Sequence, residues 1–314
     1  MTNNFYDKSE THHLGLPVIE VVGETANPGF ADLSSLQKRS VTVKEAVLED
    51  NSHNRFTGAY RYDGYSLFDI LNTFIPEKSN RNEFGSVIDL FAEVRNADGE
   101  KVIFSWGEIF YPVNMHRIII ATDVSRIVPT KTNDLWPLPS KPMIVAANDL
   151  VTERNISSPQ NITIRSFRRS IQHLSGITPP FSPYISFYKQ GIPEMRLPEA
   201  GEDEGSVTYN TVFYGRGRGI HSTTPFTGVM LKDVLKDYCH FNRHNLRQAL
   251  LCIAGTDGYR CVLSFSELFN RNDQQEFLLI NCGDEAGGRF RIFPASDFFS
   301  DRAVKSVSRI YSEE

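Results

Sequence analysis

The pattern of apolar and polar positions predicts a series of short strands along the chain. Residues 40–47 alternate with the two-residue period of a half-buried strand, and residues 16–22 and 86–95 form short, mainly apolar runs of strand length. Helical spacing occurs after Ser66, where apolar residues recur every three or four positions up to Pro76. Ser66 is therefore expected to cap a short helix that ends before Pro76.

One pattern occurs twice, at residues 97–110 and 256–269. Asp-Gly is typical of a tight turn, and the apolar run that follows it predicts a strand. The Ser-x-x-Glu sequence next along the chain is a capping box, so each strand is expected to lead into a short helix. The identical pairs are Asp98/Asp257, Gly99/Gly258, Ser105/Ser264, Glu108/Glu267 and Phe110/Phe269.

Two further blocks repeat in the same order. Residues 62–71 match residues 226–235, and the segment that begins at Asp149 matches the one that begins at Asp297, with Arg154/Arg302, Ser158/Ser306 and Ile162/Ile310 identical. Collinear repeats of this length indicate an internal duplication into two domains. The expected organisation is a first repeat over 1–165, with a loose N-terminus at 1–15, a linker over 166–182 and a second repeat over 183–314.

Composition excludes some classes of protein. The 314 residues are 40% hydrophobic and 23% charged, with a net charge of −5, which argues against a nucleic-acid-binding surface. No apolar run approaches the roughly 18 residues that span a bilayer. The first residues show no signal-peptide pattern, and both a cytoplasmic and an extracytoplasmic location stay open. The four cysteines lack metal-ligand spacing, so buried thiols are expected, and one disulfide stays open.

The order of the repeated blocks resembles the molybdopterin-binding domain of the sulfite-oxidase family. The resemblance is carried by three motifs in the second half, Phe226-Thr-Gly-Val-Met-Leu-Lys-Asp-Val-Leu, Ala254-Gly-Thr-Asp-Gly-Tyr259 and Arg291-Ile-Phe-Pro294. In the first half it is carried by the segment from Leu16 to Gly29 and the short helix that follows it. This resemblance implies an α+β fold made of two tandem domains, each with a mixed sheet and short helices, and it implies molybdopterin as the cofactor.

The sequence departs from that family at the metal ligand. The family places a molybdenum-ligating cysteine after a Val-Thr-Val-type strand, but Val41 and Val207 begin segments without cysteine. We therefore expect no catalytic residue and a non-catalytic protein that binds a small anionic or pterin-like ligand or a partner. Two alternatives stay open. One is a molybdopterin-dependent oxidoreductase without the cysteine, and the other is a purely structural or interaction protein.

The candidate ligand-binding residues lie in the second half. In the loop from Tyr214 to His221, three glycines allow close backbone approach, and Arg216 and Arg218 can each bind a phosphate or carboxylate. The alternative is a solvated loop between strands. Asp257 and Tyr259 form either a structural turn or part of a pocket. His221 is a candidate only because it lies beside the loop that contains the two arginines.

Two further stretches have a structural and a functional interpretation. His240 and His244 have the spacing of metal ligands on one helical face, but the sequence shows no third ligand, so a surface role is preferred. The proline-rich stretch from Trp136 to Pro142 is either an ordered surface loop or a lid over a cleft.

The arginine-rich loop gives the first testable prediction. If Arg216 and Arg218 bind an anion, anionic ligands should raise the thermal unfolding temperature of the wild-type protein. The double variant Arg216→Ala with Arg218→Ala should then show no such shift, because both guanidinium groups are lost. A shift of unchanged size in the variant would remove these arginines from the site.

Overall fold

The protein is built mostly of strands. The computed structural model describes residues 6–8, 10–49, 53–129, 135–174, 182–197, 205–215, 219–283 and 288–314. Of the described residues, 47% lie in strands and 13% in helices. The strands form four small sheets, and each half of the chain supplies two of them.

The first half contains eleven of the described strands, in two sheets. They are β1 (Tyr6–Lys8), β2 (His12–His13), β3 (Glu20–Gly23), β4 (Gly29–Phe30), β5 (Arg39–Leu48), β6 (Asn54–Ser66), β7 (Leu90–Asn96), β8 (Lys101–Ser105), β9 (Ile118–Pro129), β10 (Met143–Ala146) and β11 (Pro159–Ser166). One sheet has the core order β5-β6-β9-β10, and β1 and β2 also pair with β9. The other has the order β4-β3-β11-β7-β8, in which β3 and β11 are parallel.

The second half repeats this topology. Its described strands are β12 (Ile185–Lys189), β13 (Ile192–Leu197), β14 (Ser206–Gly215), β15 (Gly219–Met230), β16 (Leu250–Gly255), β17 (Arg260–Ser264), β18 (Phe277–Asn281), β19 (Phe290–Pro294) and β20 (Val307–Glu313). The orders are β14-β15-β18-β19 and β13-β12-β20-β16-β17, and β12 and β20 form the parallel pair. The register repeats as well, because Ile162 lies opposite Val94 and Ile310 lies opposite Ile253.

The helices are short. They are α1 (Leu67–Leu71), α2 (Trp106–Phe110), α3 (Leu231–Leu235), α4 (Arg243–Gln248) and α5 (Phe265–Phe269), with single 3₁₀ turns η1 (Leu33–Ser35), η2 (Val87–Asp89) and η3 (Ser300–Arg302). Ser66 caps α1 as expected, through a bond from the backbone N–H of Asp69. Ser105 and Glu108 form the complete capping box at the start of α2.

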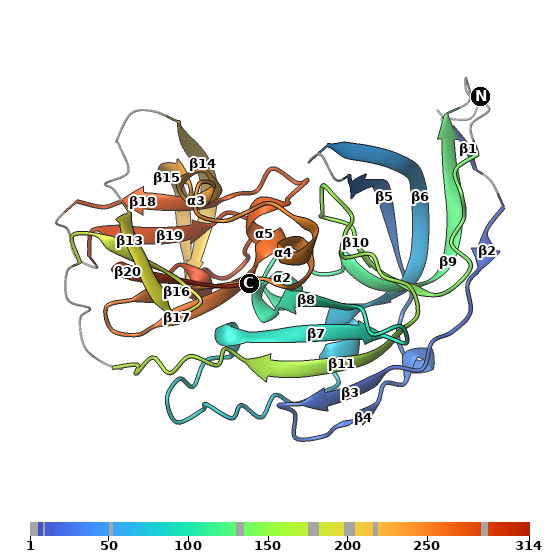
Figure 1. The fold of residues 1–314 in the computed structure, drawn as a ribbon, viewed down its shortest axis with the longest axis horizontal. Helices are drawn as coiled ribbons and strands as arrows, with labels where there is room; N and C mark the ends of the chain where they lie inside the picture. The colour runs from blue at the N-terminus through green and yellow to red at the C-terminus, as the bar shows by residue number, and fades with distance from the viewer. Residues whose placement is uncertain are drawn as a thin grey trace.

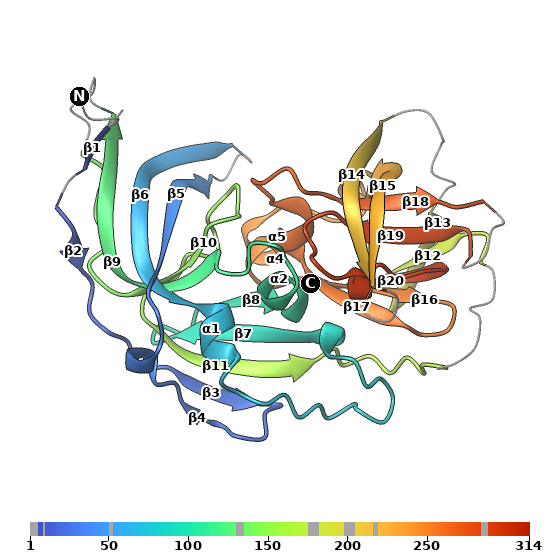
Figure 2. The same cartoon turned by 180° about the vertical axis from the view of Figure 1, so that it is seen from behind.

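The expected α+β fold of two tandem sulfite-oxidase-type domains is wrong. Figure 1 and, from behind, Figure 2 show the four sheets in a ring that resembles a four-bladed β-propeller, with α2, α4 and α5 near its centre. Helices of five or six residues are too short to form a layer against a sheet. One continuous apolar cluster also contains residues from both halves, such as Ile162 and Ile310, so the halves do not have separate cores.

The domain boundaries stay a prediction. The part of the proposed linker that the structure describes does not behave as a loose connector. Phe167 and Ile171 are buried and belong to an apolar cluster with Leu250 and Cys252 of the second half. This segment therefore contributes to the packing between the halves.

A buried ion network lies where the halves meet. The Arg154 guanidinium donates to Asp149 at 2.6 and 2.8 Å and to Glu108 at 2.9 and 3.0 Å. It also donates to Ser264 Oγ of the second half at 3.1 Å. Burial alone would lower the pKa of Arg154, but the carboxylates of Asp149 and Glu108 raise it above its ordinary value.

The second half contains the equivalent arrangement. Arg302 donates to Asp297 at 2.6 and 2.7 Å and to Glu267 at 2.5 Å. Glu267 in turn accepts a hydrogen bond of 2.6 Å from Ser105 Oγ of the first half. Gly107 is required here, because a Cβ at this position would lie 2.2 Å from the Arg302 guanidinium. Several of the residues that repeat in the sequence, among them Ser105/Ser264 and Arg154/Arg302, thus join the two halves.

Backbone hydrogen bonds cross the same interface in reciprocal pairs. The N–H of Leu150 donates to the carbonyl of Asn270, and the N–H of Phe298 donates to the carbonyl of Tyr111. In a second reciprocal pair, the N–H of Val113 donates to the carbonyl of Ser296, and the N–H of Asn272 donates to the carbonyl of Asn148. Each half therefore completes backbone hydrogen bonding in the other.

This interface predicts that the halves unfold together. Arg154→Met and Arg302→Met should each lower the unfolding free energy by about 3–5 kcal/mol, because each leaves two carboxylates buried without their cation. Urea unfolding followed by circular dichroism should show one transition for each variant.

The matched control is Arg55→Met, which removes an exposed arginine that pairs with the exposed Glu49. This control should change the unfolding free energy by less than about 1 kcal/mol. Two separate unfolding transitions would contradict joint unfolding of the halves. So would a loss of unfolding free energy in Arg154→Met and Arg302→Met that is no larger than in the control.

Candidate functional site

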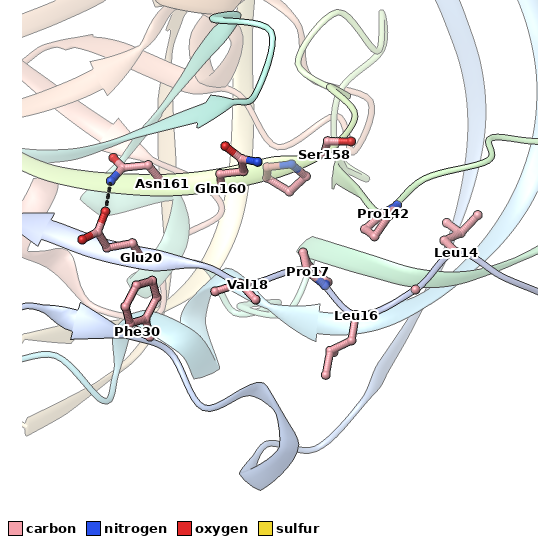
Figure 3. Close-up of a pocket in the computed structure, with 12 residues that line it drawn as sticks. Leu14, Leu16, Pro17, Val18, Glu20, Phe30, Pro142, Ser158, Gln160 and Asn161 are labelled. Carbon is pink, nitrogen blue, oxygen red and sulfur yellow. Dashed lines mark hydrogen bonds between the residues drawn. The ribbon is translucent and has the colours of Figure 1, made fainter.

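A groove of about 660 Å³ lies on the first half, between residues 14–18 and residues 158–161 (Figure 3). The first of these segments, called the strap below, leads into β3, and the second contains the start of β11. The lining residues are Leu14, Gly15, Leu16, Pro17, Val18, Glu20, Phe30, Pro142, Ser158, Pro159, Gln160 and Asn161. This volume is within the usual range of roughly 300–1,000 Å³ for small-molecule sites.

The groove exists because two strands separate. The parallel pairing of β3 and β11 begins at Glu20 opposite Asn161, and the strap and residues 158–160 diverge before that point. Pro17 and Pro159 stand in the diverging segments, and neither has a backbone N–H to donate to a continuing ladder. The chemistry of these residues therefore favours an open gap over a longer sheet.

Backbone conformation at Gly15 and Ser158 shapes the walls. Gly15 has φ of +94°, a value that glycine adopts without strain, and it brings the strap beside Pro142. Ser158 has φ of +53°, which is uncommon for serine, and its N–H donates to the Pro142 carbonyl at 2.6 Å. Ser306, its counterpart in the second half, has φ of +48°. The conformation of Ser158 is thus part of the repeated scaffold.

The strap is anchored to β9. The Leu14 N–H donates to the carbonyl of Thr122 at 2.7 Å, and β2 pairs with β9 just before it. Asp123 binds both Lys38 Nζ at 2.6 Å and His13 Nδ1 at 2.8 Å. Burial acts to raise the pKa of Asp123, but the hydrogen bonds from Lys38, His13 and Thr122 lower it to about 2.

The groove has one polar end. Asn161 Nδ2 donates to Glu20 Oε2 at 3.2 Å, and Figure 3 shows Phe30 beside this pair and Gln160 next to Asn161. Phe30 and Val18 are each 70% exposed, so apolar surface is available next to the carboxylate. Among the described residues that line the groove, Glu20 alone is charged. The groove therefore favours a neutral or cationic ligand over an anion.

The described candidates from the sequence have structural contacts. Asp257 Oδ1 accepts from the N–H of Tyr259 at 3.0 Å, which forms the turn before β17. The Tyr259 hydroxyl donates to the Asp301 carbonyl at 2.7 Å, and its ring packs edge-on against Phe84 and His173. Neither Asp257 nor Tyr259 lines the groove.

The remaining candidates have no described side-chain geometry. Arg216 and Arg218 lie outside the described residues, and the backbone of His221 is in β15 while its side chain is not described. Their proposed roles stay predictions. Across the described part of the chain, no cluster of three or more His, Cys, Asp or Glu residues could hold a metal, and His240 and His244 are exposed.

The groove does not fit the molybdopterin that the family resemblance implied. Burial raises the pKa of the Cys261 thiol to about 12 and raises that of Cys252 well above its ordinary value, so neither is a ready thiolate ligand. No described lysine or arginine lines the groove to bind a phosphate. All four cysteines are free thiols, and Cys282 is the one that is not buried.

Comparison with known proteins neither supports nor refutes the resemblance to the sulfite-oxidase family. No family model matches the chain, and no curated protein matches it. Within the described ranges, none of the helices is long and apolar enough to cross a membrane.

The groove residues were missed because the sequence interpretation followed the repeats. The strap was interpreted as the first strand from residue 16, whereas β3 begins only at Glu20. A usable signal was Pro17, which interrupts the apolar run of residues 16–19 and has no backbone N–H to donate to a strand ladder. The proline-rich insertion, interpreted as a surface loop or a lid, contributes Pro142 to one wall.

The anchor of the strap gives a prediction with a defined pH dependence. Asp123→Asn should lower the unfolding free energy by at most about 1 kcal/mol at pH 7, because the ion pairs are partly exposed. The folded-state pKa of Asp123 lies below its ordinary value of 3.8, so its stabilisation is present above that value and lost as the pH falls through about 2.

Urea unfolding at pH 7 and pH 2 tests this, with the exposed Asp237→Asn as control. Amide exchange of Leu14 should be faster in Asp123→Asn at pH 7. An equal difference between the variant and the wild type at both pH values would show that Asp123 does not act through its charge.

Proposed function

We propose that this chain is a binding protein whose groove takes a flat heterocycle, neutral or cationic, with two adjacent N–H donors on one edge. The observation that carries the proposal is the Glu20 carboxylate, held by Asn161 at the polar end of an otherwise uncharged, largely apolar groove. A pterin belongs to this class of ligand, and so does guanine.

The chemistry of recognition follows from the side chains present. Among the described residues, the Glu20 carboxylate accepts one side-chain hydrogen bond, from Asn161, so its two oxygens retain acceptor capacity for a pair of parallel N–H groups. The amides of Gln160 and Asn161 supply donors and acceptors for the remaining ring edge. Phe30, Val18 and Pro17 offer apolar surface to the ring faces, and aromatic stacking adds about 0.5–1.5 kcal/mol.

The charge of the groove separates this proposal from its alternatives. A phosphate-bearing ligand would place its charge beside Glu20 without a described cation in the lining. An anionic ligand therefore depends on Arg216 and Arg218, and that hypothesis is tested by the double variant described above. An oxidoreductase would need a redox group, and the groove offers molybdopterin neither a described cysteine nor a described cation in its lining.

The experiment compares pairs of ligands that differ only at the recognised edge. Isothermal titration would use pterin against lumazine, which has a carbonyl in place of the 2-amino group, and guanine against xanthine. Pterin or guanine should bind more tightly than its partner compound. Glu20→Gln should weaken that binding by about tenfold or more, because a charge-assisted hydrogen bond is lost.

Glu77→Gln is the matched control, since Glu77 is exposed and lies outside the groove lining. Its affinity for the same ligands should equal that of the wild type. Equal binding of lumazine and pterin, or no heat from any of the four compounds, would refute the proposed recognition by Glu20.

A further inference from the structure

A second cavity, of about 320 Å³, lies between the two halves. It is lined by Phe91, Glu93, Lys101, Ile103, Arg165, Arg168, His244, Gln248, Leu250, Glu313 and Glu314. The apolar members Phe91, Ile103 and Leu250 are buried and belong to the cluster that packs the two five-stranded sheets together. The remaining lining residues are polar, and most are charged.

The cavity lies where equivalent positions of the two halves meet. Arg165 of β11 lies opposite Phe91 of β7, and Glu313 of β20 lies opposite Leu250 of β16. These two cross-strand pairs occupy the same place in the repeated topology, and all four residues line the cavity. Equivalent positions therefore carry opposite charges, with an arginine from the first half and a glutamate from the second.

Most of the other charges in the cavity are already compensated. Glu93 is buried and bonds Arg95 at 2.7 Å, with Lys101 at 3.8 Å and Arg165 at 4.0 Å. Glu314 pairs with Lys189 at 3.0 Å. Neighbouring cations thus compensate the negative charges of Glu93 and Glu314, and we do not expect either residue to attract a ligand.

Arg165 and Glu313 are less well satisfied. Arg165 Nε is buried and has no hydrogen-bond partner among the described residues, and the contact with Glu93 is at the distance limit of an ion pair. Burial raises the pKa of Glu313, which Arg169 and Arg168 only partly offset. A cation next to Glu313 and an anion next to Arg165 would each relieve an incomplete interaction.

We propose that this cavity is a second binding site, for a small zwitterion such as a free amino acid. The ligand carboxylate would bind Arg165 and Arg168, and its ammonium group would bind Glu313. An aliphatic side chain would rest on the apolar floor formed by Phe91, Ile103 and Leu250. The site is independent of the groove, since the two share no lining residue.

The test uses three compounds of similar shape. They are L-leucine, 4-methylpentanoate, which lacks the ammonium group, and 3-methylbutylamine, which lacks the carboxylate. Titration calorimetry and saturation-transfer NMR on the full chain should show the tightest binding for leucine. Arg165→Gln and Glu313→Gln should each weaken leucine binding by about tenfold or more.

The analogues distinguish recognition from a structural effect. Glu313→Gln should not weaken the binding of 4-methylpentanoate, because that ligand has no ammonium group to pair with Glu313. Arg55→Gln serves as the control and should bind leucine with wild-type affinity, because Arg55 is exposed and does not line the cavity. Pterin should not displace leucine, which separates this site from the groove.

Two results would overturn the proposal. One is the absence of leucine binding to the wild-type protein at about 10 mM, above the millimolar range expected of a weak small ligand. The other is unchanged leucine affinity in folded Glu313→Gln, which would show that Glu313 does not bind the ammonium group. This result would hold even if Arg165→Gln did not fold.

Discussion

The two buried guanidinium groups of Arg154 and Arg302 set the constraint on which the rest of the structure depends. Each is enclosed by two carboxylates of its own half, and each network includes a serine from the opposite half. Charges taken out of water are tolerated only when their partners are correctly placed, so small shifts of one half against the other are costly. This fixes the sheets of both halves in one arrangement, in which one apolar cluster contains residues of both halves.

The duplication makes the members of this network recognisable in the sequence as repeated residues, but it does not predict that they form ion pairs. Its members Asp149, Arg154, Ser105 and Glu108 are among the positions that recur unchanged in the second half. The turns, the strands and the helix caps at Ser66 and Ser105 were also predictable, because each depends on neighbouring residues. The ring of four sheets was not, because short strands and single-turn helices suit several architectures and their arrangement depends on contacts far apart in sequence. The resemblance to the sulfite-oxidase family was carried by the same local motifs and so led to the wrong fold class.

The candidate sites were less predictable than the fold, for a related reason. Asp257 and Tyr259 stood out because they belong to the repeat, and the structure shows them holding a turn and packing against Phe84. Glu20 and Asn161 do not stand out in the sequence, since each is an ordinary strand residue. They become notable only when the parallel pairing of β3 and β11 places them together at the point where the strands separate.

Both proposed sites arise where the two halves differ. A duplicated scaffold held by a symmetric buried network can accept changes away from that network without losing the arrangement of its sheets. Glu20, the charged residue of the groove lining, corresponds to the uncharged Ser186 in the second half, because Glu20 pairs with Asn161 as Ser186 pairs with Arg309. Arg165 and Glu313 likewise occupy equivalent positions with opposite charges. Identity between the copies therefore marks the residues that stabilise this protein, and divergence between them is the better guide to where it binds.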